Sequence, residues 1–170
     1  MSINWYPGHM HKARKEILAV LNNIDILIEV VDARLPYSSQ NPIIANLRHN
    51  KPTIIVFNKC DLADPKVTQE WQDYYQSHDN VQTVTCQQNM PEKTRKILDT
   101  CRAMATERDA SFKAINAMIL GIPNVGKSTI INTLAGRIIA KTGNEPAVTK
   151  SQQKINLAHS IILHDTPGIL

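Results

Sequence analysis

One stretch of sequence decides the fold: Gly121-Ile122-Pro123-Asn124-Val125-Gly126-Lys127-Ser128. It fits the pattern G-x-x-x-x-G-K-[ST] and follows an apolar run, Ala114 to Leu120, that is predicted to be a strand. A helix is expected directly after it, to about Leu134. A strand, a glycine-rich loop and a helix in this order are the context in which the pattern predicts a phosphate-binding loop. The alternative, a glycine-rich turn without a ligand, does not explain that context.

The residue types suit phosphate chemistry. Glycines let backbone N–H groups turn inward toward phosphate oxygens, and the start of the helix adds partial positive charge. Lys127 is expected to neutralise the β- and γ-phosphates, and Ser128 to ligate Mg²⁺.

A second motif, Asp165-Thr166-Pro167-Gly168, closes an apolar strand near the end of the chain. Asp165 is therefore expected at the carboxyl end of a strand, where open α/β sheets bind ligands, and we expect it to hold the magnesium shell. Thr149, in the polar loop between the two motifs, is a further candidate ligand of Mg²⁺. Alone, the tetrapeptide could be only a turn.

The base is chosen by Asn58-Lys59-Cys60-Asp61, which follows the apolar run Thr53 to Phe57. A carboxylate can accept hydrogen bonds from the N1–H and N2 edge of guanine, while an Asn side chain can donate to the O6 and N7 acceptors. Adenine would leave Asp61 unpaired at a cost of ~1–3 kcal/mol. In isolation N-K-x-D is often a turn or a cap, but beside a phosphate loop it favours a guanine site. An ATPase is the rival interpretation.

The order of the motifs is unusual. In most GTPases the phosphate loop comes first, whereas here N-K-x-D precedes it by roughly sixty residues. This order predicts a circularly permuted domain. Such a rearrangement is tolerable because the site is assembled from strand ends, which keep their places when old termini are joined and a surface loop is opened.

Apolar runs rich in Ile and Val alternate with amphipathic segments, which is typical of an α/β fold with a parallel sheet. Strands are predicted at Ile26 to Val31, Thr53 to Phe57, Val81 to Thr85, Ala114 to Leu120, Gln153 to Leu157 and Ser160 to Leu163. Helices are predicted at about Met10 to Asn22, Thr68 to Gln76, Pro91 to Ala105 and after the phosphate loop. We therefore expect a six-stranded, mostly parallel sheet with helices on both faces, the three-layer sandwich of P-loop NTPases, as one GTP-binding domain over residues 1–170.

Composition narrows the class further. The 170 residues are 42% hydrophobic and 20% charged, enough for one globular core, and the net charge of +4 suits an RNA partner or an ordinary basic enzyme. The three cysteines show no C-x-x-C spacing, so neither disulfides nor zinc are predicted. Because no apolar leader or membrane-spanning run is seen, we expect a cytoplasmic protein without a membrane partner.

Two further stretches carry a resemblance, together with the three nucleotide motifs: Trp5-Tyr6-Pro7-Gly8-His9-Met10, and Asp32-Ala33-Arg34-Leu35-Pro36 with Ser38-Ser39-Gln40-Asn41-Pro42. With them, the whole chain resembles the YlqF/RbgA family of circularly permuted ribosome-assembly GTPases.

The resemblance implies roles for individual residues. Asn58, Lys59 and Asp61 would read guanine, with the loop that contains Cys86 and Gln87 over the base, although this loop departs from the usual Ser-Ala pattern. Phosphates and magnesium would be held by Asn124, Val125, Gly126, Lys127, Ser128 and Thr129. Gly168 would sense the γ-phosphate, and Asn124 resembles the asparagine that places K⁺ in some related GTPases.

The resemblance also bears on catalysis and partners. Ras-like enzymes orient the attacking water with a Gln, but Ile169 follows Gly168 here, so His9 is the candidate replacement. The family implies the large ribosomal subunit or its rRNA as partner and a C-terminal helical domain, which this chain is expected to lack. The predicted function is slow hydrolysis of GTP to GDP in large-subunit assembly; the alternative is a nucleotide-dependent binding module with little or no hydrolysis.

Overall fold

The structure, a computed structural model, describes residues 11, 15, 18–40, 42–48, 51–109, 111, 114–139 and 153–165. At its centre lies a six-stranded sheet with the order β3-β2-β1-β4-β6-β5. The strands are β1 (Ile26–Asp32), β2 (Thr53–Asn58), β3 (Val81–Thr85), β4 (Ile115–Leu120), β5 (Gln153–Asn156) and β6 (Ile161–Asp165). All pairings are parallel except that of β5 with β6. The predicted α/β class and mostly parallel sheet are confirmed.

The helices are α2 (Pro42–Arg48), α3 (Pro65–Gln76), α4 (Pro91–Arg108) and α5 (Lys127–Ala135), with short 3₁₀ turns η1 (Cys60–Leu62) and η2 (Ala158–Ser160). Residues 18–21 are also helical. α3 begins earlier than predicted, because the Asp64 side chain accepts hydrogen bonds from the Lys66 and Val67 N–H groups and Pro65 occupies the first helical position. α2 was not predicted, since seven residues are too few to show a helical period.

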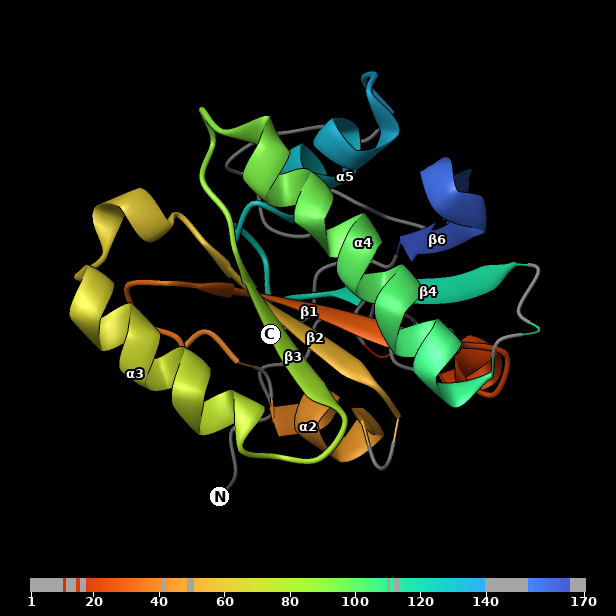
Figure 1. The fold of residues 1–170 in the computed structure, drawn as a ribbon, viewed down its shortest axis with the longest axis horizontal. Coiled ribbons are helices and arrows are strands. Elements are labelled where there is room, and N and C mark those ends of the chain that lie inside the picture. The colour runs from red at the N-terminus through yellow and green to blue at the C-terminus, as the bar shows by residue number, and fades with distance from the viewer. Residues whose placement is uncertain are drawn as a thin grey trace.

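The helices cover both faces of the sheet (Figure 1). On one face, α4 and α5 bury the main core, to which Ile28, Ile54 and Ile119 contribute from neighbouring strands. On the other face, Tyr75 of α3 packs against Phe57, and Leu21 packs with Leu27 beside them. Strands buried on both sides explain the nearly continuous Ile and Val runs. The molecule is therefore the predicted three-layer sandwich.

The sheet has one place where the strand order reverses. β1 lies between β2 and β4, and the chain leaves β2 and β4 at the same carboxyl edge. Ligands bind in the crevice outside such a switch point in open α/β sheets. Both N-K-x-D and the phosphate loop start there. No helix in the described ranges is long and apolar enough to cross a membrane.

Candidate functional site

A pocket of about 620 Å³ opens at this carboxyl edge. Segments far apart in the sequence line it: the turn after β1, the N-K-x-D segment after β2, the loop after β3, α4, the phosphate loop and α5. The lining residues are Arg34, Asn58, Lys59, Asp61, Leu62, Gln87, Gln88, Thr94, Asn124, Gly126, Thr129, Ile130 and Thr133. A pocket of this size suits a nucleotide.

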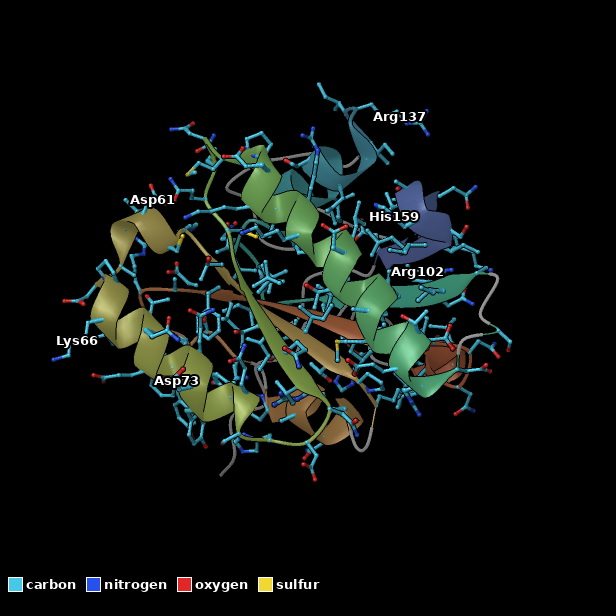
Figure 2. The ribbon with its side chains drawn as sticks, viewed as in Figure 1. Asp61, Lys66, Asp73, Arg102, Arg137 and His159 are labelled. Carbon is cyan, nitrogen blue, oxygen red and sulfur yellow. The ribbon has the colours of Figure 1, made fainter. Side chains whose placement is uncertain are left out.

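Asn58 and Lys59 fasten the base motif to the phosphate loop. The buried Asn58 side chain donates from Nδ2 to the Val125 carbonyl at 2.8 Å, and Lys59 donates from Nζ to the Asn124 carbonyl at 3.2 Å. Lys59 adopts a left-handed backbone, with φ of 60°, where the chain turns from β2 into η1. Asp61 lies on η1 and lines the pocket, whereas Asp73 lies on the next helix, α3, and does not line it (Figure 2). Two predicted motifs thus form one wall.

The phosphate loop turns sharply between β4 and α5. Asn124 and Gly126 both have positive φ, 68° and 94°. A Cβ on Gly126 would overlap Nδ2 of Asn58, so this position requires glycine both for its backbone angle and for the close approach. α5 begins at Lys127, which leaves its first N–H groups directed at the loop.

Lys127, the first residue of α5, pairs with Asp165 at the end of β6, and neither residue is among those that line the pocket. Their Nζ and Oδ1 atoms are 3.0 Å apart, and the two side chains are only 7% and 1% exposed. The pair stands at ion-pair distance without hydrogen-bond alignment, and both carboxylate oxygens are buried without a hydrogen-bond partner. Burial lowers the pKa of Lys127, and Asp165 opposes that shift. A buried ion pair stabilises a protein only if further hydrogen bonds satisfy its remaining polar atoms, so this pair would be stabilised by an additional donor or ion.

The remaining phosphate-loop residues lie where the loop enters α5. Val125 is buried, Ser128 is half-buried, and Thr129 is exposed and lines the pocket. In the described part of the chain, no group of three or more His, Cys, Asp or Glu could hold a metal. A Mg²⁺ ion bound here would keep several waters and need only one or two carboxylates beside phosphate oxygens, as this ion commonly does, and Asp165 is the candidate carboxylate.

Cys86 and Gln87 differ in their access to the pocket. Gln87 lines it and accepts hydrogen bonds at Oε1 from Cys60 Sγ and Lys93 Nζ. The Cys86 thiol is fully buried, which raises its pKa to about 11. The Cys86 N–H already donates to the Phe57 carbonyl at 2.8 Å. Of these two residues, only Gln87 is among those that line the pocket.

Asp32 and Arg34 belong to the site, although the sequence singled them out only through a family resemblance. The Arg34 guanidinium donates to both Asp32 carboxylate oxygens, at 3.0 and 2.8 Å. Lys59 Nζ lies 3.7 Å from the same carboxylate. The hydrogen bond from Arg34 is the main cause that lowers the pKa of Asp32. The position of Asp32 at the end of the predicted strand was the available signal.

Three candidates, His9, Thr149 and Gly168, lie outside the described residues.

Comparison with known proteins assigns the family. A model described as "50S ribosome-binding GTPase" matches residues 116–170. Ribosome biogenesis GTPase A of Priestia megaterium is 46% identical, over all of this chain and 62% of that protein. The Thermotoga maritima protein of the same name is 36% identical, over 99% of this chain and 59% of the relative. The chain thus spans about three fifths of the length of these relatives.

Solved structures agree. GNP-bound YlqF from T. maritima superposes with a TM-score of 0.62 at 30% identity, over 94% of this chain and 58% of that one. YjeQ from the same organism has a TM-score of 0.58 at 17% identity and supports the fold alone. The base motif lies on β2 and the phosphate loop follows β4, so the permuted order is built into the sheet. The chain therefore belongs to the YlqF/RbgA family of circularly permuted GTPases.

Proposed function

We propose that residues 1–170 form one GTP-binding domain that binds GTP and GDP with Mg²⁺ at the pocket beside the phosphate loop. The observation that carries this proposal is the pair of hydrogen bonds from Asn58 and Lys59 to the carbonyls of Val125 and Asn124. They join the base motif to the phosphate loop around one pocket, and a nucleotide must meet both at once.

The chemistry of the pocket residues supports guanine. The Asp61 carboxylate can accept from N1–H and N2, while Asn58 and Gln87 stand near enough to line the same space. Lys127, buried at the first position of α5, is the proposed partner of the β- and γ-phosphates.

Asp165 supports a magnesium site, because its buried carboxylate has Lys127 as an ion-pair partner but neither oxygen is satisfied by a hydrogen bond. We propose that Ser128, Thr149 and Asp165 hold the ion and its waters. When bound, Mg²⁺ neutralises charge on the transferred phosphoryl group. By resemblance, Asn124 is proposed to help place K⁺ beside the phosphates.

The proposed reaction is hydrolysis of GTP to GDP and phosphate in assembly of the large ribosomal subunit, in the cytoplasm. Phosphoryl transfer depends on positioning and charge, and Ile169 cannot orient water, so intrinsic turnover is expected to be slow. His9 is the proposed group that orients the water, and Gly168 the proposed sensor of the γ-phosphate. The name and family description of the matched proteins support the ribosomal partner.

The test of the nucleotide site is titration of a fluorescent GDP analogue with magnesium, competed by GTP, GDP, ATP and xanthosine diphosphate. Displacement by guanine nucleotides and not by ATP is expected. The variant Asp61→Asn replaces an acceptor with a donor, so preference should move from GDP toward the xanthine nucleotide, whose C2 carbonyl can accept. The matched control Asp73→Asn makes the same charge change on α3, away from the pocket.

Equal displacement by ATP, or unchanged selectivity of Asp61→Asn, would refute the guanine site. The second candidate, a binding module with little or no hydrolysis, is separated by measuring phosphate release with and without large ribosomal subunits. Turnover that stays at the blank rate in both conditions would favour the module.

A further inference from the structure

Aromatic residues gather in one part of the molecule. The sequence holds two Trp, four Tyr and two Phe, and the five of them that the structure describes lie on α3 or beside it. Tyr75 packs on Phe57 and stacks on Trp71, with ring centroids 5.9 Å apart in both pairs. These three rings belong to the core of that face. Tyr37 and Tyr74, in contrast, are 73% and 54% exposed, so core packing does not account for them.

The two exposed tyrosines line a second pocket, which we call the α2–α3 pocket. It measures about 490 Å³ and is bounded by the last residue of α2, the last turn of α3 and the first residues of β2 and β3. It therefore reaches the amino ends of β2 and β3, while Tyr37 and Gln40 join it from the turn that follows the carboxyl end of β1. No described residue lines both pockets.

The wall of the α2–α3 pocket is basic and aromatic. Tyr37, Tyr74 and Tyr75 share it with Arg48, Lys51 and His78. Lys51 Nζ donates to the Ile24 carbonyl at 2.9 Å, a neutral partner, so its charge remains available. Among the described lining residues, Asp79 is the one carboxylate, and Ala45 and Val81 are the only aliphatic side chains. A groove for an apolar peptide would be lined mainly by aliphatic side chains.

An ion pair with the buried Glu29 positions Arg48. Its guanidinium stands 3.5 Å from the carboxylate of Glu29, which is 1% exposed in the middle of β1. The Arg48 side chain keeps 20% of its surface exposed at the pocket. Burial raises the Glu29 pKa, and the charge of Arg48 and a hydrogen bond with Gln40 oppose that shift. The guanidinium is thus fixed in position while it remains able to face an anion.

We propose that the α2–α3 pocket binds one or two unstacked nucleotides of single-stranded RNA. The bases stack on Tyr37 and Tyr74, and the phosphates face Arg48 and Lys51. Stacking on aromatic rings beside basic groups is the way proteins hold single strands, because every base has a flat face and every linkage an anion. This inference goes beyond the GTPase site and does not depend on it.

The test uses fluorescence anisotropy of a short fluorescein-labelled single-stranded RNA with the 170-residue chain. Tyr37→Ala and Tyr74→Ala are each expected to weaken RNA binding by about fivefold or more, since they remove a stacking surface. Tyr37→Phe and Tyr74→Phe keep the ring and should retain binding. Val67→Ala, an exposed position on α3 that does not line the pocket, is the matched control.

Binding of the fluorescent GDP analogue is measured on the same preparations, so a folding defect or failure of the GTP site is recognised separately. Ultraviolet crosslinking is expected to place the RNA on Tyr37 or Tyr74. The proposal is overturned if the wild type binds GDP but not single-stranded RNA, which would leave a protein partner for this surface. It is also overturned if the alanine variants bind RNA like the wild type, or if the phenylalanine variants lose as much binding as the alanine variants.

Discussion

At the scale of single residues, Asn58 and Gly126 show how the two motifs depend on each other. The Asn58 amide reaches the Val125 carbonyl only because the neighbouring Gly126 carries no side chain. Gly136 also has positive φ, 70°, but nothing lies within 4 Å of the position a Cβ would take. Gly126 is therefore required by both steric contact and backbone angle, whereas Gly136 is required by its backbone angle alone.

Gly126→Ala is therefore expected to weaken GDP binding by about tenfold or more, because losing one buried hydrogen bond and adding strain costs ~1–3 kcal/mol. Gly136→Ala should lower stability by about 1 kcal/mol through backbone strain alone and leave GDP affinity unchanged. Titration of the fluorescent GDP analogue and urea denaturation measure both. Equal GDP affinity of the two variants would contradict the steric account.

Asp32 is the other residue whose effect is indirect. Its carboxylate holds Arg34 and lies 3.7 Å from the Lys59 ammonium, whose side chain borders the nucleotide pocket. Asp32→Asn should weaken GDP binding severalfold by loosening Lys59, and the effect should shrink at high salt. Asp73→Asn is the control with the same change of charge. If both variants lose equal affinity, the effect is one of net charge and not of positioning.

At the scale of elements, Glu29 ties β1 to α2 through Arg48. Desolvation is the largest influence on this carboxyl and raises its pKa, and the attraction of Arg48 offsets that only in part. A group whose folded pKa is raised contributes its full stability below the unfolded pKa and loses it as pH rises through the folded value. Raising the pH above the ordinary pKa of a glutamate therefore costs stability at Glu29.

Glu29→Gln is accordingly expected to increase the free energy of unfolding at neutral pH by ~1 kcal/mol, with the gain shrinking as pH falls toward the ordinary pKa of a glutamate. Urea denaturation at several pH values measures this. Destabilisation at neutral pH would mean that the ion pair with Arg48 outweighs the cost of burial.

At the scale of the whole molecule, buried acids on both faces of the sheet couple stability to alkaline pH. Burial raises the pKa of Cys86 to about 11 and that of Cys101 and Tyr75 to about 12. The unfolded chain therefore loses these protons first. Stability should be fully present below about pH 9 and fall as pH rises from there toward about 12.

Cys101→Ala should reduce that alkaline slope, although it will lower stability at neutral pH by removing a buried side chain. Denaturation curves recorded at neutral and alkaline pH measure the slope. A slope identical to that of the wild type would show that the Cys101 thiol does not contribute to it.

The family, the α/β class, the mostly parallel sheet and the permuted order of the motifs were all predictable from the sequence. The phosphate loop and N-K-x-D are local patterns, because glycine conformation and the donor and acceptor pattern of a side chain are properties of single residues. Buried parallel strands likewise leave apolar runs that can be recognised without knowing their neighbours. The roles predicted for the individual site residues, including His9, Thr149 and Gly168, stay predictions.

Only the tertiary structure decided which residues meet. Asn58 reaches Val125, Lys59 reaches both Asn124 and Asp32, and Lys127 faces Asp165 because strand order brings separate strand ends to one edge. The α2–α3 pocket arises in the same way from segments that carry no motif. Local sequence specifies conformation and the chemistry of single side chains. These contacts join residues far apart in the sequence and follow from the packing of the whole sheet, so short sequence patterns cannot predict them.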